Sequence, residues 1–235
     1  MDSENTPTPI VSCRGVAKTY RQGKLAVKAL TDIDLEVESG GFMALAGPSG
    51  SGKTTLLNLI GGLDTPDSGT IQVDGKAYAN LSRAEMADLR LHTIGFVFQA
   101  YNLIPVLSAL ENVEYVMLLQ GIPTQERRRR AGEILDVVGL EGKHHRRPAE
   151  LSGGQQQRVA VARAIVANPA IVLADEPTAN LDSKTGERLL DLMQRMNRER
   201  SVTFIFSTHD PMVMDHARRL VLLRDGRIAE DKRKG

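Results

Sequence analysis

The chain has 235 residues, a length that fits one large α/β domain or a core with a modest subdomain. Apolar residues make up 41% of it, and 30 Lys and Arg against 29 Asp and Glu leave a net charge of +1. This balance excludes a general electrostatic attraction to nucleic acid or anionic lipid. A single cysteine, Cys13, excludes an internal disulfide and suits a reducing compartment.

The N-terminal segment MDSENTPTPI is acidic and polar, so it lacks the basic start and apolar stretch of a signal peptide. No apolar run of the sequence approaches the ~20 residues that span a bilayer. We expect residues 1–9 to be a flexible lead-in. We also expect a cytoplasmic protein that lies on the inner face of the cell membrane through a membrane partner.

Short alternating runs over residues 10–38, such as LTDIDLEVES, are typical of antiparallel strands. Four later runs are almost continuously apolar, as strands are when helices cover both faces of a parallel sheet. These runs are FMALAG, IGFVFQ, IVLADE and VTFIFSTH. Ligands bind at the carboxyl ends of such strands, so we expect the residues at those ends to meet along one edge. They are Gly47, Gln99, Asp175, Glu176 and His209.

The middle of the chain predicts helices. Ser82 with Glu85, and Ser108 with Glu111, have the spacing of a capping box. ENVEYVMLLQG and TQERRRRAGEILDVVGLEG are typical of amphipathic helices that end at glycines. We expect one domain over residues 10–235, with a core over about 10–98 and 166–230 and an inserted helical subdomain over about 99–165.

Near the C-terminus, LVLLRDGRIAE places Asp-Gly between two apolar runs, which predicts a β-hairpin. The remaining DKRKG is expected to be a charged tail.

The segment GPSGSGKT matches the P-loop pattern G-x-x-x-x-G-K-[ST] at every fixed position, between a predicted strand and a predicted helix. Glycines let backbone N–H groups surround phosphates, and the helix N-terminus adds partial positive charge. Lys53 is expected to bind the β- and γ-phosphates, and Thr54 to ligate Mg²⁺. A glycine-rich turn without a ligand is the alternative. The expected nucleotide contacts are Gly47, Pro48, Ser49, Gly50, Ser51, Gly52, Lys53, Thr54 and Thr55.

Two carboxylates follow the predicted strand IVLAD. Asp175 is placed to hold Mg²⁺, and Glu176 to polarise the water that attacks the γ-phosphate. Adjacent side chains of an extended segment point to opposite sides, so both roles need the chain to turn at the strand end. Pro177 favours that turn. Without the P-loop, the pair would indicate only a solvated strand terminus.

Three further residues are weak indicators when each is taken alone. The Gln99 amide oxygen suits Mg²⁺ or the attacking water, but a glutamine after a strand usually has no role. His209 is placed to touch the γ-phosphate, although a histidine at a strand end is usually structural. Tyr20 lies in a short mixed run, where a core aromatic is the alternative.

The segment LSGGQQQR contains a second feature suited to phosphate. Ser152 can cap a helix, Gly153 and Gly154 let a ligand reach the backbone, and a helix is expected to begin at Gln155. The sequence alone shows only a second anion-binding helix start.

Taken together, these motifs resemble the ATPase domain of ABC transporters over about residues 10–230. The segments that carry the resemblance occur in the family's order: GPSGSGKTT, FVFQAYNLIP, LSGGQQQRVAVARAI, IVLADEP, ANLDS and STHD. The resemblance implies an α/β fold: a P-loop NTPase core with a mainly parallel sheet, an N-terminal antiparallel β-subdomain and an inserted α-helical subdomain. It also implies ATP and Mg²⁺ as cofactors.

The resemblance implies residue roles as well. Tyr20 would stack on adenine, Gln99 would sense Mg²⁺ and the membrane partner, Glu176 would be the general base and His209 would hold the γ-phosphate. The family works as an ATP-bridged homodimer, in which the LSGG segment binds the γ-phosphate held by the other protomer. This assigns Ser152, Gly153, Gly154 and Gln155 to the partner's ATP, with Asp182 crossing the interface beside the P-loop.

The segments ADEPTANLDS, NLIPVLSALENV and GLDTPDSGTI look most like ATPases that serve lipoprotein release, macrolide-type efflux and cell-division complexes. A separate integral membrane permease is the implied partner, with a lipophilic or peptide-like cargo. An importer ATPase, or an ABC ATPase that acts on nucleic acid or ribosomes, is the alternative. We expect no nucleic-acid partner, because KHHRRP lacks interleaved aromatics.

Overall fold

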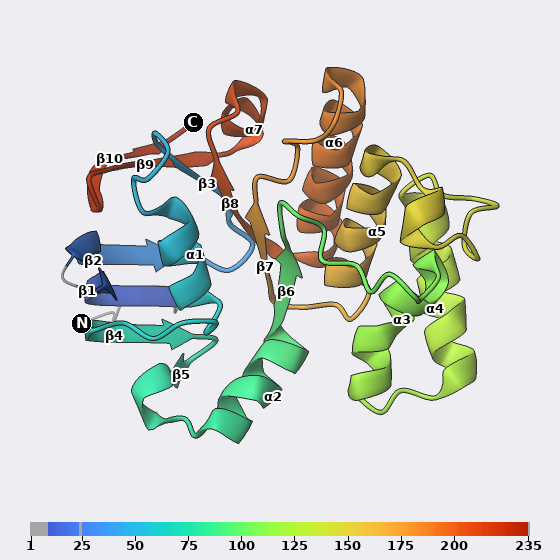
Figure 1. Ribbon diagram of the computed structural model, residues 1–235, viewed down its shortest axis with the longest axis horizontal. Coiled ribbons are helices and arrows are strands. Elements are labelled where there is room, and N and C mark those ends of the chain that lie inside the picture. Colours follow the sequence, from blue (N-terminus) through green and yellow to red (C-terminus); the bar gives the residue numbers. More distant parts are fainter. Residues whose placement is uncertain (1–8, 24, 235) are drawn as a thin grey trace, which may run out of the picture.

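The computed structural model describes residues 9–23 and 25–234. Within them the chain forms two β-sheets with helices packed around them (Figure 1). The lead-in expected over residues 1–9 lies outside the described residues except for Pro9.

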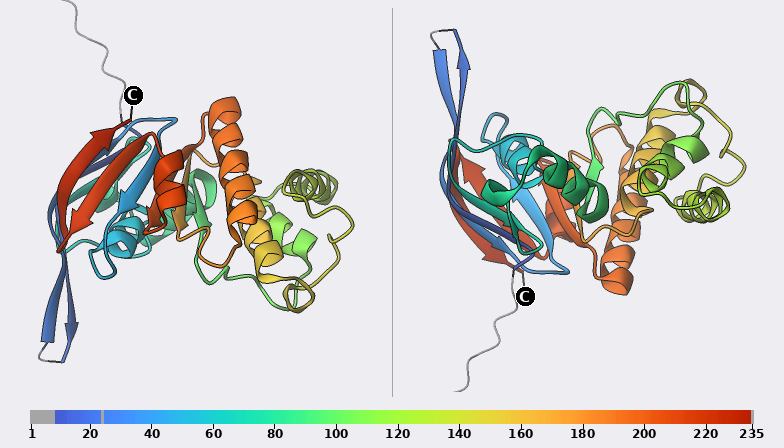
Figure 2. Two further views of the ribbon diagram at one scale, coloured as in Figure 1. Left: turned by 90° about the horizontal axis from the view of Figure 1, so that it is seen from above. Right: turned by 90° about the horizontal axis from the view of Figure 1, so that it is seen from below.

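The first sheet has the strand order β2-β1-β4-β5 and is antiparallel throughout. The alternation over residues 10–38 therefore predicted its first two strands correctly, and their hairpin projects far beyond the second sheet (Figure 2). The strands are β1 (Val11–Gln22), β2 (Leu25–Val37), β4 (Ser68–Val73) and β5 (Lys76–Ala77).

The second sheet has the order β10-β9-β3-β8-β7-β6 and is parallel except for β10, which runs antiparallel to β9. All five residues of β3 and all six of β8 are buried, which explains why these strands have continuous apolar runs. The strands are β3 (Phe42–Ala46), β6 (Ile94–Val97), β7 (Ile171–Asp175), β8 (Thr203–Thr208), β9 (Arg219–Arg224) and β10 (Arg227–Arg233).

Alternate residues of the second sheet belong to two different cores. Met43 and Ile205 face the core shared with the first sheet, whereas Phe42, Phe204 and Phe206 face the core shared with the helices. The three phenylalanine rings lie 4.8 to 5.9 Å apart, centroid to centroid. The sheet is therefore covered on both faces, as its continuous apolar strands predict.

Seven α-helices are present in the described residues. Both predicted capping boxes are present, at the starts of α2 and α3. The helices are α1 (Lys53–Ile60), α2 (Arg83–Thr93), α3 (Ala109–Leu119), α4 (Thr124–Val137), α5 (Gly153–Ile165), α6 (Ser183–Arg200) and α7 (Pro211–His216). Single 3₁₀ turns lie at Tyr78–Asn80 and Pro148–Glu150.

The helices α3, α4 and α5 pack on one another at one end of the molecule (Figure 1). They share a core with the larger sheet, to which α3 contributes Val113 and Met117 and α4 contributes Leu135. Among the described residues, no helix is both long enough and apolar enough to cross a membrane.

The predicted hairpin at the C-terminus is present as β9 and β10, but the charged tail expected after it is wrong. Strand β10 continues to Arg233, and Asp231 to Arg233 pair with β9. Arg219 donates to both carboxylate oxygens of Asp231, at 2.8 and 2.6 Å. Hydrogen bonds from Arg219 lower the pKa of Asp231. This cross-strand ion pair favours the pairing of the charged segment with β9.

Candidate functional site

The P-loop connects β3 to α1, and its shape depends on glycine. Gly47 has φ 147° and Gly52, the N-cap of α1, has φ 103°, both in the region that favours glycine. A Cβ on Gly47 would lie 2.2 Å from the carbonyl oxygen of Leu223 in β9. A Cβ on Gly52 would lie 2.6 Å from the carbonyl oxygen of Ala29 in β2. The loop is therefore held close to a strand of each sheet.

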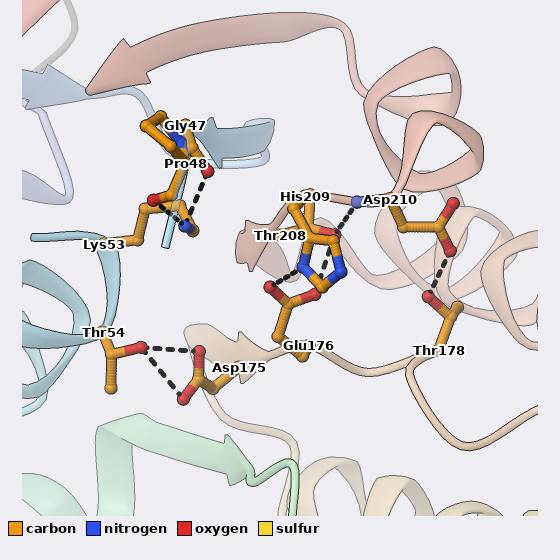
Figure 3. Close-up of polar contacts among 10 residues, drawn as sticks. All are labelled: Gly47, Pro48, Lys53, Thr54, Asp175, Glu176, Thr178, Thr208, His209 and Asp210. Carbon is orange, nitrogen blue, oxygen red and sulfur yellow. Dashed lines mark hydrogen bonds and ion pairs between the residues drawn. The ribbon is translucent and has the colours of Figure 1, made fainter. Parts of the chain in front are cut away.

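The side chain of Lys53 folds back over this loop (Figure 3). It is 7% exposed, and its Nζ donates to the carbonyl oxygens of Gly47 (2.8 Å) and Pro48 (3.0 Å). Ser51 Oγ is also buried and has no hydrogen-bond partner among the described residues. A buried ammonium group and an unpaired hydroxyl beside backbone N–H groups form a cradle suited to phosphate.

Thr54 and Asp175 come together from two elements far apart in the sequence. Thr54 Oγ1, in the first turn of α1, donates to Asp175 Oδ1 at 3.1 Å and Oδ2 at 3.3 Å (Figure 3). Asp175 is the last residue of β7. Hydroxyl and carboxylate oxygens are ligands that Mg²⁺ prefers, so this pair fits the metal site that the sequence predicts.

The chain turns at the end of β7, as the two carboxylate roles require. The turn lies at Glu176 itself, which has φ 47°, one residue before Pro177. The Glu176 side chain is 11% exposed, and its Oε1 lies 2.6 Å from His209 Nδ1. The His209 side chain, by contrast, is 71% exposed. Glu176 is thus a sheltered carboxylate with an accessible histidine beside it (Figure 3).

A second set of contacts holds Glu176 from the other side. Buried Thr208 donates from its hydroxyl to Glu176 Oε2 at 3.2 Å and accepts from the Asp210 amide at 2.9 Å. Asp210 Oδ2 accepts from the Thr178 hydroxyl at 2.7 Å. These bonds connect the loops after β7 and β8 (Figure 3). Sequence reasoning missed all three residues, although Thr208 and Asp210 flank the predicted His209.

These elements open onto a cleft of about 680 Å³, here called the P-loop cleft. Gly47 and Asp175 are absent from its lining, but they bond to Lys53 and Thr54, which are part of it. Of the residues predicted from the sequence, its lining contains Tyr20, Pro48, Ser49, Gly50, Ser51, Gly52, Lys53, Thr54, Thr55, Gln99, Glu176 and His209. The predicted meeting of strand ends at one edge is therefore observed.

Tyr20 lines this cleft together with Val27, its partner on β2, and Ala29. The residue is 43% exposed, so the alternative of a core aromatic is wrong. Its hydroxyl donates to Asp64 Oδ2 at 2.8 Å.

The loop that carries Gln99 is held from two sides. Its carbonyl oxygen accepts from Asn180 Nδ2 at 3.3 Å. Further along the loop, Arg163 of α5 donates to the carbonyl oxygens of Tyr101 (2.8 Å) and Asn102 (2.6 Å). Both of these residues have positive φ, 59° and 48°. The arginine thus fixes a tight turn directly to α5.

The second predicted phosphate loop is a capped helix start. Ser152 Oγ accepts from the Gln155 amide at 3.4 Å, and Gln155 Oε1 accepts from the Ser152 amide at 3.1 Å. The expected helix start at Gln155 is wrong, because α5 begins at Gly153. The capping box fixes the first turn despite two glycines of low helix propensity.

Asp182 caps the neighbouring helix α6 and accepts from the Thr185 amide at 3.0 Å. A Cβ on Gly154 would lie 3.2 Å from Leu181 Cδ2, so the starts of α5 and α6 lie side by side. The residues of this pair of helix starts are absent from the lining of the P-loop cleft: Ser152, Gly153, Gly154, Gln155 and Asp182.

The family model described as "ABC transporter" matches residues 30–179, more than half of the chain. This chain belongs to the ABC transporter ATPase family. It binds ATP and is an ATPase, and its fold is the P-loop NTPase α/β fold that the resemblance implies.

Two curated relatives and one solved structure are similar to this chain. The chain is 46% identical, over 98% of its length, to the macrolide export ATP-binding/permease protein MacB 1/2 of Paracoccus denitrificans. It spans about a third (34%) of that protein. It is 43% identical to the lipoprotein-releasing system ATP-binding protein LolD of Chromohalobacter salexigens, over 98% of this chain and 100% of the relative.

The solved structure is the ATP-binding cassette MJ0796 of Methanocaldococcus jannaschii, a dimer in a post-hydrolysis state bound to ADP and Pi. The two folds agree with a TM-score of 0.90 at 43% identity, over 95% of this chain and 98% of the other.

We expect Gly47→Ala to abolish ATP binding, because the new methyl group would meet the Leu223 carbonyl and displace the P-loop. Gly75→Ala is the matched control. Gly75 also has positive φ (73°), in the turn after β4, but a Cβ there meets no atom within 4 Å. The control should lose only about 1–2 kcal/mol of unfolding free energy and keep its ATP affinity. ATP titration and urea unfolding measure both, and equal ATP affinity in the two variants would refute the close approach.

Proposed function

We propose that this chain is the ATP-hydrolysing subunit of an export-type transporter. Two copies would close around two ATP molecules and power a separate integral membrane permease. The cargo would be a lipophilic or peptide-like molecule that is exported, extracted or moved by force transmitted across the membrane. The observation that carries the proposal is the division of the predicted residues: one set lines the P-loop cleft, and Ser152 with Asp182 lies outside it.

The P-loop cleft would hold ATP along its length. Tyr20 is proposed to stack on adenine, because aromatic rings stack on bases and this one is exposed at the cleft. The backbone N–H groups of residues 47–55 and the ammonium of Lys53 are proposed to bind the phosphates. Lys53 would exchange its bonds to the Gly47 and Pro48 carbonyls for phosphate oxygens, a charge-assisted and therefore stronger contact.

Thr54, Asp175 and Gln99 are the residues proposed to hold Mg²⁺. The first two already have oxygen atoms 3.1 Å apart, and Gln99 lines the same cleft. The metal would supply positive charge that offsets the charge developing on the phosphates.

Glu176 is proposed as the general base. Its carboxylate is sheltered, and Thr208 and His209 each hold one of its oxygens. It would accept a proton from the attacking water, whose oxygen bonds to the γ-phosphorus as the bond to the β–γ bridging oxygen breaks and ADP leaves. His209 is exposed enough to reach the γ-phosphate.

Ser152, Gly153, Gly154 and Gln155 are proposed to bind the γ-phosphate in the P-loop cleft of the second protomer. The start of α5 offers backbone N–H groups and partial positive charge. Asp182 would cross the interface beside the partner's P-loop. A two-fold contact is self-complementary, so a single interface makes two equivalent composite sites. The dimeric relative bound to ADP and Pi supports this arrangement.

Removing the general base, Glu176, should trap the dimer with ATP bound. We expect Glu176→Gln to bind ATP, to hydrolyse it about 10²–10⁴-fold more slowly and to elute as a dimer on size exclusion with ATP. Glu199→Gln, an exposed position at the far end of α6, should behave as wild type. Near wild-type turnover of Glu176→Gln would reassign the base, and a monomer with ATP would count against the composite site.

The helix start at Ser152 provides a separate test of the composite site. We expect Ser152→Arg to leave ATP binding by the monomer intact and to abolish hydrolysis, because the bulky cation obstructs the partner's phosphate. Ser152→Thr keeps a capping hydroxyl and should retain most of the turnover. If Ser152→Arg removed ATP binding by the monomer, this segment would act on the ATP of its own chain.

The alternatives are an importer ATPase and an ABC ATPase that acts on nucleic acid or ribosomes. The MacB and LolD relatives favour the export branch. We expect the chain to co-sediment with the inner face of the cell membrane when its permease is present, and to be released when the permease is deleted. Sedimentation with ribosomes instead would favour the second alternative.

A further inference from the structure

We propose that Asp64 is a positioning residue for ATP binding. Together with Lys18, it holds the ring of Tyr20 in place to stack on the adenine of ATP. The inference rests on the proposed stacking of adenine on Tyr20. Neither Asp64 nor Lys18 lines the P-loop cleft, so both would act only through Tyr20.

Asp64 joins three groups at once. Its Oδ2 accepts from the Tyr20 hydroxyl at 2.8 Å, and its Oδ1 accepts from Lys18 Nζ and the Thr65 amide, each at 2.7 Å. Lys18 Nζ also donates to the Thr65 carbonyl oxygen at 2.7 Å. Each carboxylate oxygen therefore accepts from its own donors. The orientation of the Asp64 carboxylate, and with it the position of the Tyr20 hydroxyl, is fixed.

Charge and burial strengthen this network. The Lys18 side chain is 10% exposed and that of Asp64 is 30% exposed, so the pair is partly shielded from water. Burial alone would raise the pKa of Asp64, but hydrogen bonds from Lys18, Tyr20 and Thr65 outweigh it and lower the pKa. The hydrogen bond to Asp64 likewise raises the pKa of Lys18. Asp64 is thus a carboxylate, and Lys18 a cation, at neutral pH.

Lys18 also restricts the ring directly. Its Nζ lies over the Tyr20 ring, 5.2 Å from the centroid, within the range of a cation–π contact. The ring therefore has a cation over one face and a fixed acceptor at its hydroxyl. A base that stacks on it takes the other face, and the ring loses little further freedom when the base binds.

Tyr20 needs such support because of its place in the fold. It lies on β1 opposite Val27 of β2, two residue pairs before the last pair of the hairpin. This hairpin extends beyond the larger sheet (Figure 2). Asp64, by contrast, follows the end of α1, the helix whose first turn carries Lys53 and Thr54. The segment Lys53–Asp64 therefore reaches the phosphate loop at one end and the stacking ring at the other. This segment sets the position of the Tyr20 ring relative to the phosphates.

The test compares ATP with inorganic tripolyphosphate, which has the phosphates but no base. We expect Tyr20→Phe and Asp64→Ala each to weaken ATP binding about three- to tenfold and to leave the Kd of tripolyphosphate unchanged. The kcat at saturating ATP should also be unchanged, with the effect confined to KM. Asp88→Ala is the control, because Asp88 is an exposed carboxylate on α2 whose partner is His92 (3.1 Å), outside this network. It should change neither affinity.

Tyr20→Ala separates this inference from the proposed function. It should weaken ATP binding, and adding Asp64→Ala to it should cause no further loss. If Asp64→Ala weakened tripolyphosphate as much as ATP, Asp64 would support the P-loop itself and the inference would be overturned. If Tyr20→Ala weakened ATP binding and Asp64→Ala did not, the positioning role of Asp64 would be overturned, whereas the proposed stacking of adenine on Tyr20 would stand. If Tyr20→Ala kept full ATP affinity, the stacking role and the inference would fail together.

Discussion

Parallel pairing of β3, β8, β7 and β6 places the chemistry of this protein at one edge of a sheet. Ala46 pairs with Thr208, Asp175 pairs with Ser207, and Val97 pairs with Ala174. The residues that follow these strands therefore emerge together, although more than 160 positions separate the first from the last. Both faces of the sheet are buried, so a strand cannot shift by one residue without placing its side chains in the wrong core.

Two features then convert this edge into a site. The glycines of the P-loop let the backbone approach β9 and β2, which leaves its N–H groups and Lys53 gathered around one space. Across that space, the left-handed turn at Glu176 separates two adjacent carboxylates, one bonded to Thr54 and the other to His209. Positive charge on one wall and negative charge on the other suit a polyanion bound with a metal ion.

Much of this arrangement was predictable from local patterns. Continuous apolar runs predicted the parallel strands, and the polar residues at their carboxyl ends, Gln99, Asp175, Glu176 and His209 among them, were predicted to meet at one edge. The contacts that hold these residues were not predictable, because they join positions without a shared pattern. Tyr20 and Asp64 are 44 residues apart, and nothing in either segment indicates the other. The early start of α5 was missed because its two glycines disfavour a helix by propensity, whereas the Ser152–Gln155 capping box overrides them.

The bond pair from Arg163 has a mechanical consequence. It ties the turn after Gln99 to the last part of α5, while Ser152 lies at the opposite end of the same helix. These ends are about 16 Å apart along the axis. A tilt of α5 of about 5° at the arginine would move the capped end by roughly 1.4 Å, more than the range of about 0.5 Å over which N–H···O distances vary. A rotation of α5 about this anchor would therefore move Ser152 much further than the turn after Gln99.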